Sequence, residues 1–140
     1  MKILSQVFVL VSVAAGPAVI AIAVHPQLAN YRRAGLEEGA VRLAEVREWH
    51  EEVLWIDARS KTEFVRDHIP GAISLDETDF DRGLGAILAA WTPGRRVVVY
   101  CSTSACHTSH AVAERLRAAG LNDVFFLHGG WDSWQLTARK

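Results

Sequence analysis

The hydrophobic pattern alternates along the chain between short apolar runs and segments with helical spacing. The apolar runs have the length and the β-branched or aromatic content of buried strands, and they cover residues 53–56, 72–75, 96–100 and 123–127. Residues 41–43 add a candidate short edge strand. Helical patterns lie between the runs, over residues 44–52, 61–67, 79–91 and 109–119. Strands that alternate with helices predict an α/β fold with a mostly parallel sheet.

The N-terminal segment differs in composition from the rest of the chain. Residues 3–24 carry no charged side chain, and they are as many as the roughly 20 residues that cross a bilayer as a helix. We therefore expect a transmembrane anchor in residues 1–25, a polar linker in 26–40 and a folded domain in 41–140.

A cleaved signal peptide is the alternative, with Ala21-Ile22-Ala23 as its small-residue cleavage site. The anchor is favoured because the apolar run exceeds the core of about 7–15 residues that signal peptides usually have. A third interpretation is an ordinary buried helix of a soluble domain.

The first two interpretations predict different locations. An uncleaved anchor places the domain at the cell membrane, and we expect it on the extracytoplasmic side because short N-terminal anchors commonly translocate the chain that follows. Cleavage would give a secreted or periplasmic protein. The flanking charges, Lys2 before the segment and Arg32 and Arg33 after it, are nearly balanced and do not decide the orientation.

The charge of the chain argues against a nucleic-acid partner. Lys and Arg number 15, Asp and Glu number 16, and the net charge is −1 with no basic run. Binding to phosphates would need such a run. The two cysteines, Cys101 and Cys106, are too few for a four-cysteine zinc site.

Candidate chemistry follows the predicted strands, where parallel sheets bind their ligands. The strongest signal is Cys101, which comes directly after the run 96–100 and before small, hydroxylated residues and a helix. Backbone N–H groups of such a loop can surround an anion. We expect this field to lower the pKa of the thiol and to stabilise a thiolate or persulfide. The alternative is a cysteine that serves only as a small buried side chain.

Three motifs, in order and spacing, resemble the rhodanese-like domain family. They are residues 57–59 (Asp-Ala-Arg) with 67–73, then Tyr100-Cys101 with its loop and helix, then 127–131 with Trp134. The resemblance implies a single α/β domain with a central, mostly parallel five-stranded sheet flanked by helices, preceded here by one N-terminal hydrophobic helix. It also implies a catalytic cysteine that cycles through a persulfide.

The resemblance assigns roles residue by residue. Cys101 matches the family's nucleophile. The loop that holds the persulfide corresponds to Ser102, Thr103, Ser104, Ala105, Cys106 and His107. Asp57 and Arg59 match supporting residues near the site, where they can equally form a structural ion pair, and residues 129–131 match turn and packing positions.

These roles imply a sulfurtransferase that needs no metal or cofactor. Cys101 takes the sulfane sulfur of a small sulfur-containing donor and gives it to a thiol or to cyanide. Two other functions stay open. One is a membrane-tethered, non-catalytic binding module, and the other is a thiol redox switch formed by Cys101 and Cys106.

The loop departs from the family pattern at three points. It has no Arg or Lys, so dianionic thiosulfate has no guanidinium to bind it. The related phosphatases need an Arg six positions after the cysteine, and His107 stands there, which argues against phosphatase chemistry. Cys106 stands where a cation is often found, and it either attacks the Cys101 persulfide or packs inward. A metal site that adds His107 and His110 to the cysteines fits no familiar zinc spacing.

Overall fold

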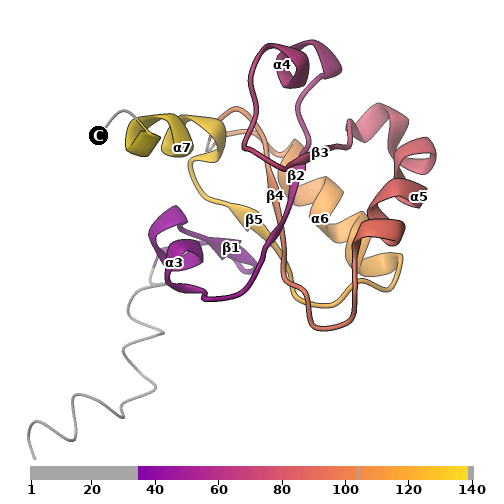
Figure 1. Ribbon diagram of the computed structural model, residues 1–140. Helices are drawn as coiled ribbons and strands as arrows, with labels where there is room; N and C mark the ends of the chain where they lie inside the picture. The colour runs from indigo at the N-terminus through magenta and orange to yellow at the C-terminus, as the bar shows by residue number, and fades with distance from the viewer. Residues whose placement is uncertain (1–34, 104, 139–140) are drawn as a thin grey trace, which may run out of the picture. The chain divides into compact units, whose positions relative to one another are not determined.

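The computed structural model describes residues 35–103 and 105–138 (Figure 1). The predicted membrane segment 3–24 lies outside these residues, and the folded unit begins at Leu36. No helix formed by the described residues is both long and apolar enough to span a bilayer.

Strands and helices alternate along the unit, as the hydrophobic pattern predicts. In chain order the elements are β1 (Ala40–Val41), α3 (Leu43–Glu48), β2 (Leu54–Asp57), α4 (Lys61–Arg66), β3 (Ile73–Ser74), the 3-10 turn η1 (Glu77–Asp79), α5 (Phe80–Ala90), β4 (Val97–Tyr100), α6 (Thr108–Ala118), β5 (Val124–Leu127) and α7 (Gly130–Ala138). Within the described residues, five strands form one parallel sheet in the order β1-β5-β4-β2-β3. The predicted five-stranded α/β fold is confirmed.

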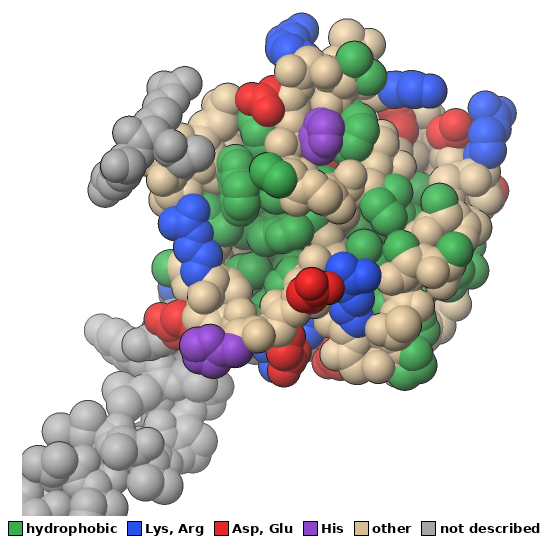
Figure 2. All heavy atoms as spheres, in the orientation of Figure 1, with side chains coloured by type: hydrophobic (Ala, Val, Ile, Leu, Met, Phe, Trp, Pro, Cys, Tyr) green, Lys and Arg blue, Asp and Glu red, His purple; other side chains and the backbone are tan. Residues whose placement is uncertain are grey.

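Alternating residues of the central strand β4 build the two layers of the core. Val97 and Val99 pack on the face covered by α5 and α6, while Val98 and Tyr100 pack on the face covered by α3 and α7 (Figure 1). The second layer is rich in aromatic residues that are only partly buried, and apolar side chains reach the surface on the side of the molecule seen in Figure 2.

Two boundaries and one additional helix differ from the prediction. The helix predicted over 44–52 ends at Glu48, because Trp49 takes an extended backbone and its ring packs against Phe125. The fold also takes in the end of the predicted linker 26–40, since Leu36 packs against the core and Ala40 pairs with β5. The helix α7 was not expected, because two successive glycines are typical of a turn.

Candidate active site

The predicted nucleophile lies at the carboxyl end of the central strand. Cys101 follows β4 directly and is 1% exposed. The neighbours of β4 in the sheet are β2 and β5, so the segments that follow all three strands meet at one edge. This arrangement brings the Cys101 loop next to the Asp57–Arg59 segment and the start of α7.

The first turn of α7 holds the backbone of the nucleophile. The Trp131 N–H donates to the Cys101 carbonyl at 2.7 Å, and the Asp132 N–H donates to the Ser102 carbonyl at 3.2 Å. A Cβ on Gly130 would lie 2.3 Å from the Cys101 carbonyl oxygen, and the φ of Gly130 is +51°. Glycine is therefore needed at position 130 both for its backbone conformation and for this close approach.

The Cys101 thiol is directed into its own loop and toward the start of α6. Its S–H lies within hydrogen-bond range of the Thr103 carbonyl at 3.5 Å and of the Cys106 carbonyl at 3.4 Å. The hydroxyl and the backbone N–H of Ser109 are close enough to the sulfur to lower the pKa of the thiol. Ser109 is 3% exposed and lies in the first turn of α6, the end of a helix that favours a negative charge. Ser109 was not among the predicted site residues, although the sequence places a serine at the start of the helix that follows the loop.

Burial governs the acidity of Cys101. Loss of contact with water raises the pKa of its thiol, and a hydrogen bond to Cys106 raises the pKa further, whereas the Ser109 contacts lower it by less. The expectation of a lowered pKa is therefore wrong for this arrangement. The physical reason is burial, because a sulfur removed from water loses the hydration that would stabilise its charged form.

Cys106 has the opposite character. Its burial raises the thiol pKa, but a hydrogen bond donated by Cys101, contacts from Thr108 and the Ser102 N–H together lower the pKa by more. Cys106 is partly exposed, and neither cysteine is in a disulfide. The two thiols therefore influence each other, and a negative charge is more stable on Cys106 than on Cys101.

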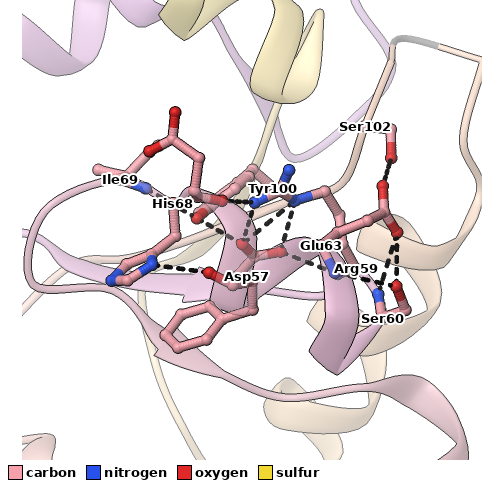
Figure 3. Close-up of polar contacts among 10 residues, drawn as sticks. Asp57, Arg59, Ser60, Glu63, His68, Ile69, Tyr100 and Ser102 are labelled. Atoms are coloured by element: carbon pink, nitrogen blue, oxygen red, sulfur yellow. Dashed lines mark hydrogen bonds and ion pairs between the residues drawn. The ribbon is translucent and has the colours of Figure 1, made fainter.

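Asp57 and Arg59 form a buried ion pair behind the loop (Figure 3). The Arg59 Nη2 to Asp57 Oδ2 distance is 2.6 Å, with the two side chains 4% and 0% exposed. The Tyr100 hydroxyl donates to Asp57 Oδ2 at 2.7 Å and accepts from the Ile69 N–H at 3.1 Å. The Arg59 guanidinium lies 4.6 Å from the centre of the Trp131 ring. The pair thus ties β2, β4 and α7 together, and its position agrees with the structural ion pair that the sequence left open.

A carboxylate lies at the rim of the loop (Figure 3). Glu63 Oε1 accepts from the Ser102 hydroxyl at 3.0 Å, and Oε2 accepts from the Ser60 hydroxyl at 2.8 Å. The Ser60 hydrogen bond is the main cause of the lowered pKa of Glu63. Sequence analysis also missed Glu63 as a site residue. The Ser60-x-x-Glu63 spacing of a capping box marks the start of α4, but it does not reveal the contact with Ser102.

Of the remaining predicted loop residues that the structure describes, none has a side chain that hydrogen-bonds to the Cys101 sulfur. Thr103 and Ala105 are exposed, and the Ala105 N–H donates to the Thr103 hydroxyl at 3.3 Å. Ser104 lies outside the described residues. His107 is exposed and lines a separate groove, with His110 and Glu114 of α6, that Cys101 does not line.

Comparisons with known proteins agree with this architecture. The uncharacterized protein slr1261 of Synechocystis sp. is 31% identical over 83 residues, which are 59% of this chain and 43% of that protein, so the chain spans less than half of that relative. The BH2092 protein of Bacillus halodurans has a similar structure, with a TM-score of 0.62 and 19% identity over 81% of this chain and 83% of that one. A rhodanese-related protein of Thermoplasma volcanium gives a TM-score of 0.55 and 21% identity over 70% and 91%.

These structural likenesses establish the fold, and the sequence itself establishes the family. The model of the rhodanese-like domain matches residues 34–137, which include every element of the sheet and the whole Cys101 loop. The chain therefore belongs to the rhodanese-like domain family.

Proposed function

We propose that this protein is a sulfurtransferase that carries sulfane sulfur on Cys101. The family includes sulfurtransferases as well as non-catalytic members, so the proposal depends on the residues of this site. The observation that carries it is the position of Cys101, which lies at the end of β4 with the hydroxyl and N–H of Ser109, at the start of α6, close enough to its sulfur to favour a negative charge there. A cysteine that only filled space would not need donors aimed at its sulfur.

The proposed reaction begins with the loss of the Cys101 proton. The S–H already points to Cys106, whose lowered pKa makes its thiolate available as the proton acceptor. Cys101 Sγ then attacks the outer sulfur of a donor R–S–SH. The new Cys101 sulfur–sulfur bond forms as the donor bond breaks, and R–S⁻ leaves. The N–H and hydroxyl of Ser109 stabilise the negative charge on the sulfur.

The charge around the loop favours a donor other than thiosulfate. Glu63 accepts a hydrogen bond from Ser102 and has a lowered pKa, so the carboxylate is negative at neutral pH. The loop sequence has no Lys or Arg to offset that charge. A dianion is disfavoured next to a carboxylate. We therefore propose a donor of lower charge, such as the persulfide of a small thiol.

Mass spectrometry tests the proposal directly. The purified full chain is treated with a small-thiol persulfide, and the peptide with Cys101 should gain one sulfur atom, about 32 Da, in a form that a thiol reductant removes. Cys101→Ser should lose the gain, while Gly85→Ala, a change within α5 where a Cβ meets nothing within 4 Å, should keep it. The absence of added sulfur on Cys101 with both persulfide and thiosulfate would overturn the proposal.

A non-catalytic binding module is the second candidate, and one observation favours it. Cys101 is 1% exposed and burial raises the pKa of its thiol, which are properties of a packing residue. In this case neither sulfur donors nor alkylating reagents react with Cys101 while the protein is folded. The same mass measurement separates the two candidates.

We also propose that residues 3–24 anchor the protein in the cell membrane, with the domain on the extracytoplasmic side. The support for the anchor is the uncharged apolar run itself. A secreted or periplasmic protein released by cleavage after Ala23 is the alternative outcome of a fractionation experiment.

A further inference from the structure

We propose that Cys106 is the resolving thiol of this site and that the sulfur acceptor belongs to the class of dithiol reductants. Cys106 attacks the Cys101 persulfide, hydrogen sulfide leaves, and a Cys101–Cys106 disulfide remains until a dithiol opens it. The inference rests on the proposed function, because it requires a persulfide on Cys101. The family resemblance implies a thiol or cyanide as the sulfur acceptor, and the inference specifies a dithiol.

The geometry of the loop places the two cysteines against each other. The Cys101 sulfur lies 3.4 Å from the Cys106 carbonyl oxygen, and the two thiols are close enough for each to shift the pKa of the other. The Cys106 N–H donates to the Thr103 carbonyl at 3.3 Å, a turn that folds the loop back toward Cys101. Both thiols are free. The sulfur that would attack is therefore next to the sulfur that would be attacked.

The surroundings of Cys106 favour its thiolate. Thr108, in the first turn of α6, contributes its hydroxyl and its backbone N–H, and Ser102 contributes a backbone N–H. These donors and the positive end of the helix stabilise a negative sulfur. Cys106 is also the more exposed member of the pair. The thiolate, and not the thiol, is the attacking species in such exchanges.

The proposed step needs no external oxidant, because the outer sulfur takes the electrons that the two cysteine sulfurs lose. Cys106 Sγ forms a bond to Cys101 Sγ, the bond from Cys101 Sγ to the outer sulfur breaks, and that sulfur leaves as HS⁻. The outer sulfur is reduced to sulfide, and the two cysteine sulfurs are oxidised to a disulfide. A dithiol reductant then reduces this disulfide, becomes a disulfide itself and restores both cysteines.

Proximity favours Cys106 over a thiol from solution. Cys101 is 1% exposed, so an external acceptor has little access to its sulfur, and Glu63 hydrogen-bonds to the next residue in the chain, Ser102. A neighbouring thiol within the same loop reacts with a large effective concentration. Cyanide and small thiolates are anions and also meet the Glu63 carboxylate.

A single-turnover experiment tests the inference. The reduced full chain receives about one equivalent of a small-thiol persulfide, excess reagent is removed, and sulfide release and peptide masses are followed with no reductant present. We expect about one sulfide per chain and a disulfide that links the two cysteine peptides. Dithiothreitol should then restore turnover much better than an equal thiol concentration of 2-mercaptoethanol.

The variants distinguish this inference from the proposed function. Cys106→Ser and Cys106→Ala should both take up the sulfur on Cys101 more slowly, because the proton acceptor is gone, and should hold it at least tenfold longer, because no thiol in the loop displaces it. Gly85→Ala, a change within α5 where a Cβ meets nothing within 4 Å, should behave as the unmodified chain. A persulfide that survives equally long in the unmodified chain, with no disulfide, would overturn the inference and leave the proposed function standing. Absence of added sulfur in the unmodified chain and in both Cys106 variants would overturn both.

Discussion

Replacing Gly130 with alanine tests whether the start of α7 holds the Cys101 loop in place. The added Cβ would lie 2.3 Å from the Cys101 carbonyl oxygen and 3.1 Å from its carbonyl carbon, both of them backbone atoms. These atoms cannot swing aside as the end of a side chain would. We therefore expect the loop and the first turn of α7 to move apart.

The structure gives the size of the effect. The φ of Gly130 is +51°, and the left-handed conformation costs an alanine about 1–2 kcal/mol. Separation also weakens the 2.7 Å hydrogen bond from the Trp131 N–H to the Cys101 carbonyl, which contributes about 0.5–1.5 kcal/mol. The free energy of unfolding should fall by about 2–3 kcal/mol, which lowers the Tm of a domain of this size by about 10 °C.

Gly85→Ala is the matched control. Gly85 lies within α5, and a Cβ there meets nothing within 4 Å. Alanine is a better helix former than glycine, so this change should raise the free energy of unfolding by about 0.5–1 kcal/mol. Urea unfolding followed by circular dichroism measures both variants, and persulfide formation measures the loop. A Gly130→Ala protein within about 0.5 kcal/mol of the unmodified chain would refute the reasoning.

Three further predictions concern the sulfur, the rim and the membrane segment. Ser109→Ala removes a contact that lowers the pKa of Cys101, so the rate of Cys101 alkylation should shift to higher pH and fall about tenfold at pH 8. An unchanged pH profile would contradict the contact. Glu63→Gln keeps an oxygen for the Ser102 hydrogen bond but removes the charge, so kcat/KM should rise about two- to tenfold for thiosulfate and change little for a neutral persulfide. An equal change for both donors would show that charge is not the cause. The full chain should sediment with membranes and resist salt extraction; recovery of a soluble form that begins near Val24 would show cleavage instead.

The layers of the fold could be predicted from the sequence because the spacing of apolar residues shows which side chains are buried. Val97–Tyr100 is a continuous apolar run and lies, fully buried, in the centre of the sheet. The amphipathic pattern of residues 109–119 likewise predicted α6 to within a residue at each end. The helix α7 was hidden because Gly129 and Gly130 do form a turn, with φ values of 81° and 51°, and the helix begins on the second of them.

The chemistry of the site was harder to predict than its position. The place of Cys101 at the end of β4 follows from the strand pattern, whereas the acidity of its thiol depends on how deeply the sulfur is buried and on how close Cys106 and Ser109 lie to it. The loop conformation sets both, and a run of small residues does not reveal that conformation. The contacts of Ser109 and Glu63 depend on how α6 and α4 are oriented toward the loop. A capping-box spacing reveals where α4 begins but not that its carboxylate reaches Ser102.

The buried ion pair and the two free thiols lie close together but make different contacts. Asp57 and Arg59 are buried; Asp57 accepts a hydrogen bond from Tyr100, and Arg59 lies over the Trp131 ring. Losing either partner of the ion pair would leave an uncompensated charge in the core. This arrangement holds the backbone on both sides of Cys101 in one position. Among the described residues, the groups that hydrogen-bond to the thiols or shift their pKa belong to the loop and to the first turn of α6. The proposed change of the sulfur from thiol to persulfide to disulfide would therefore leave in place the contacts that keep the sheet and α7 together.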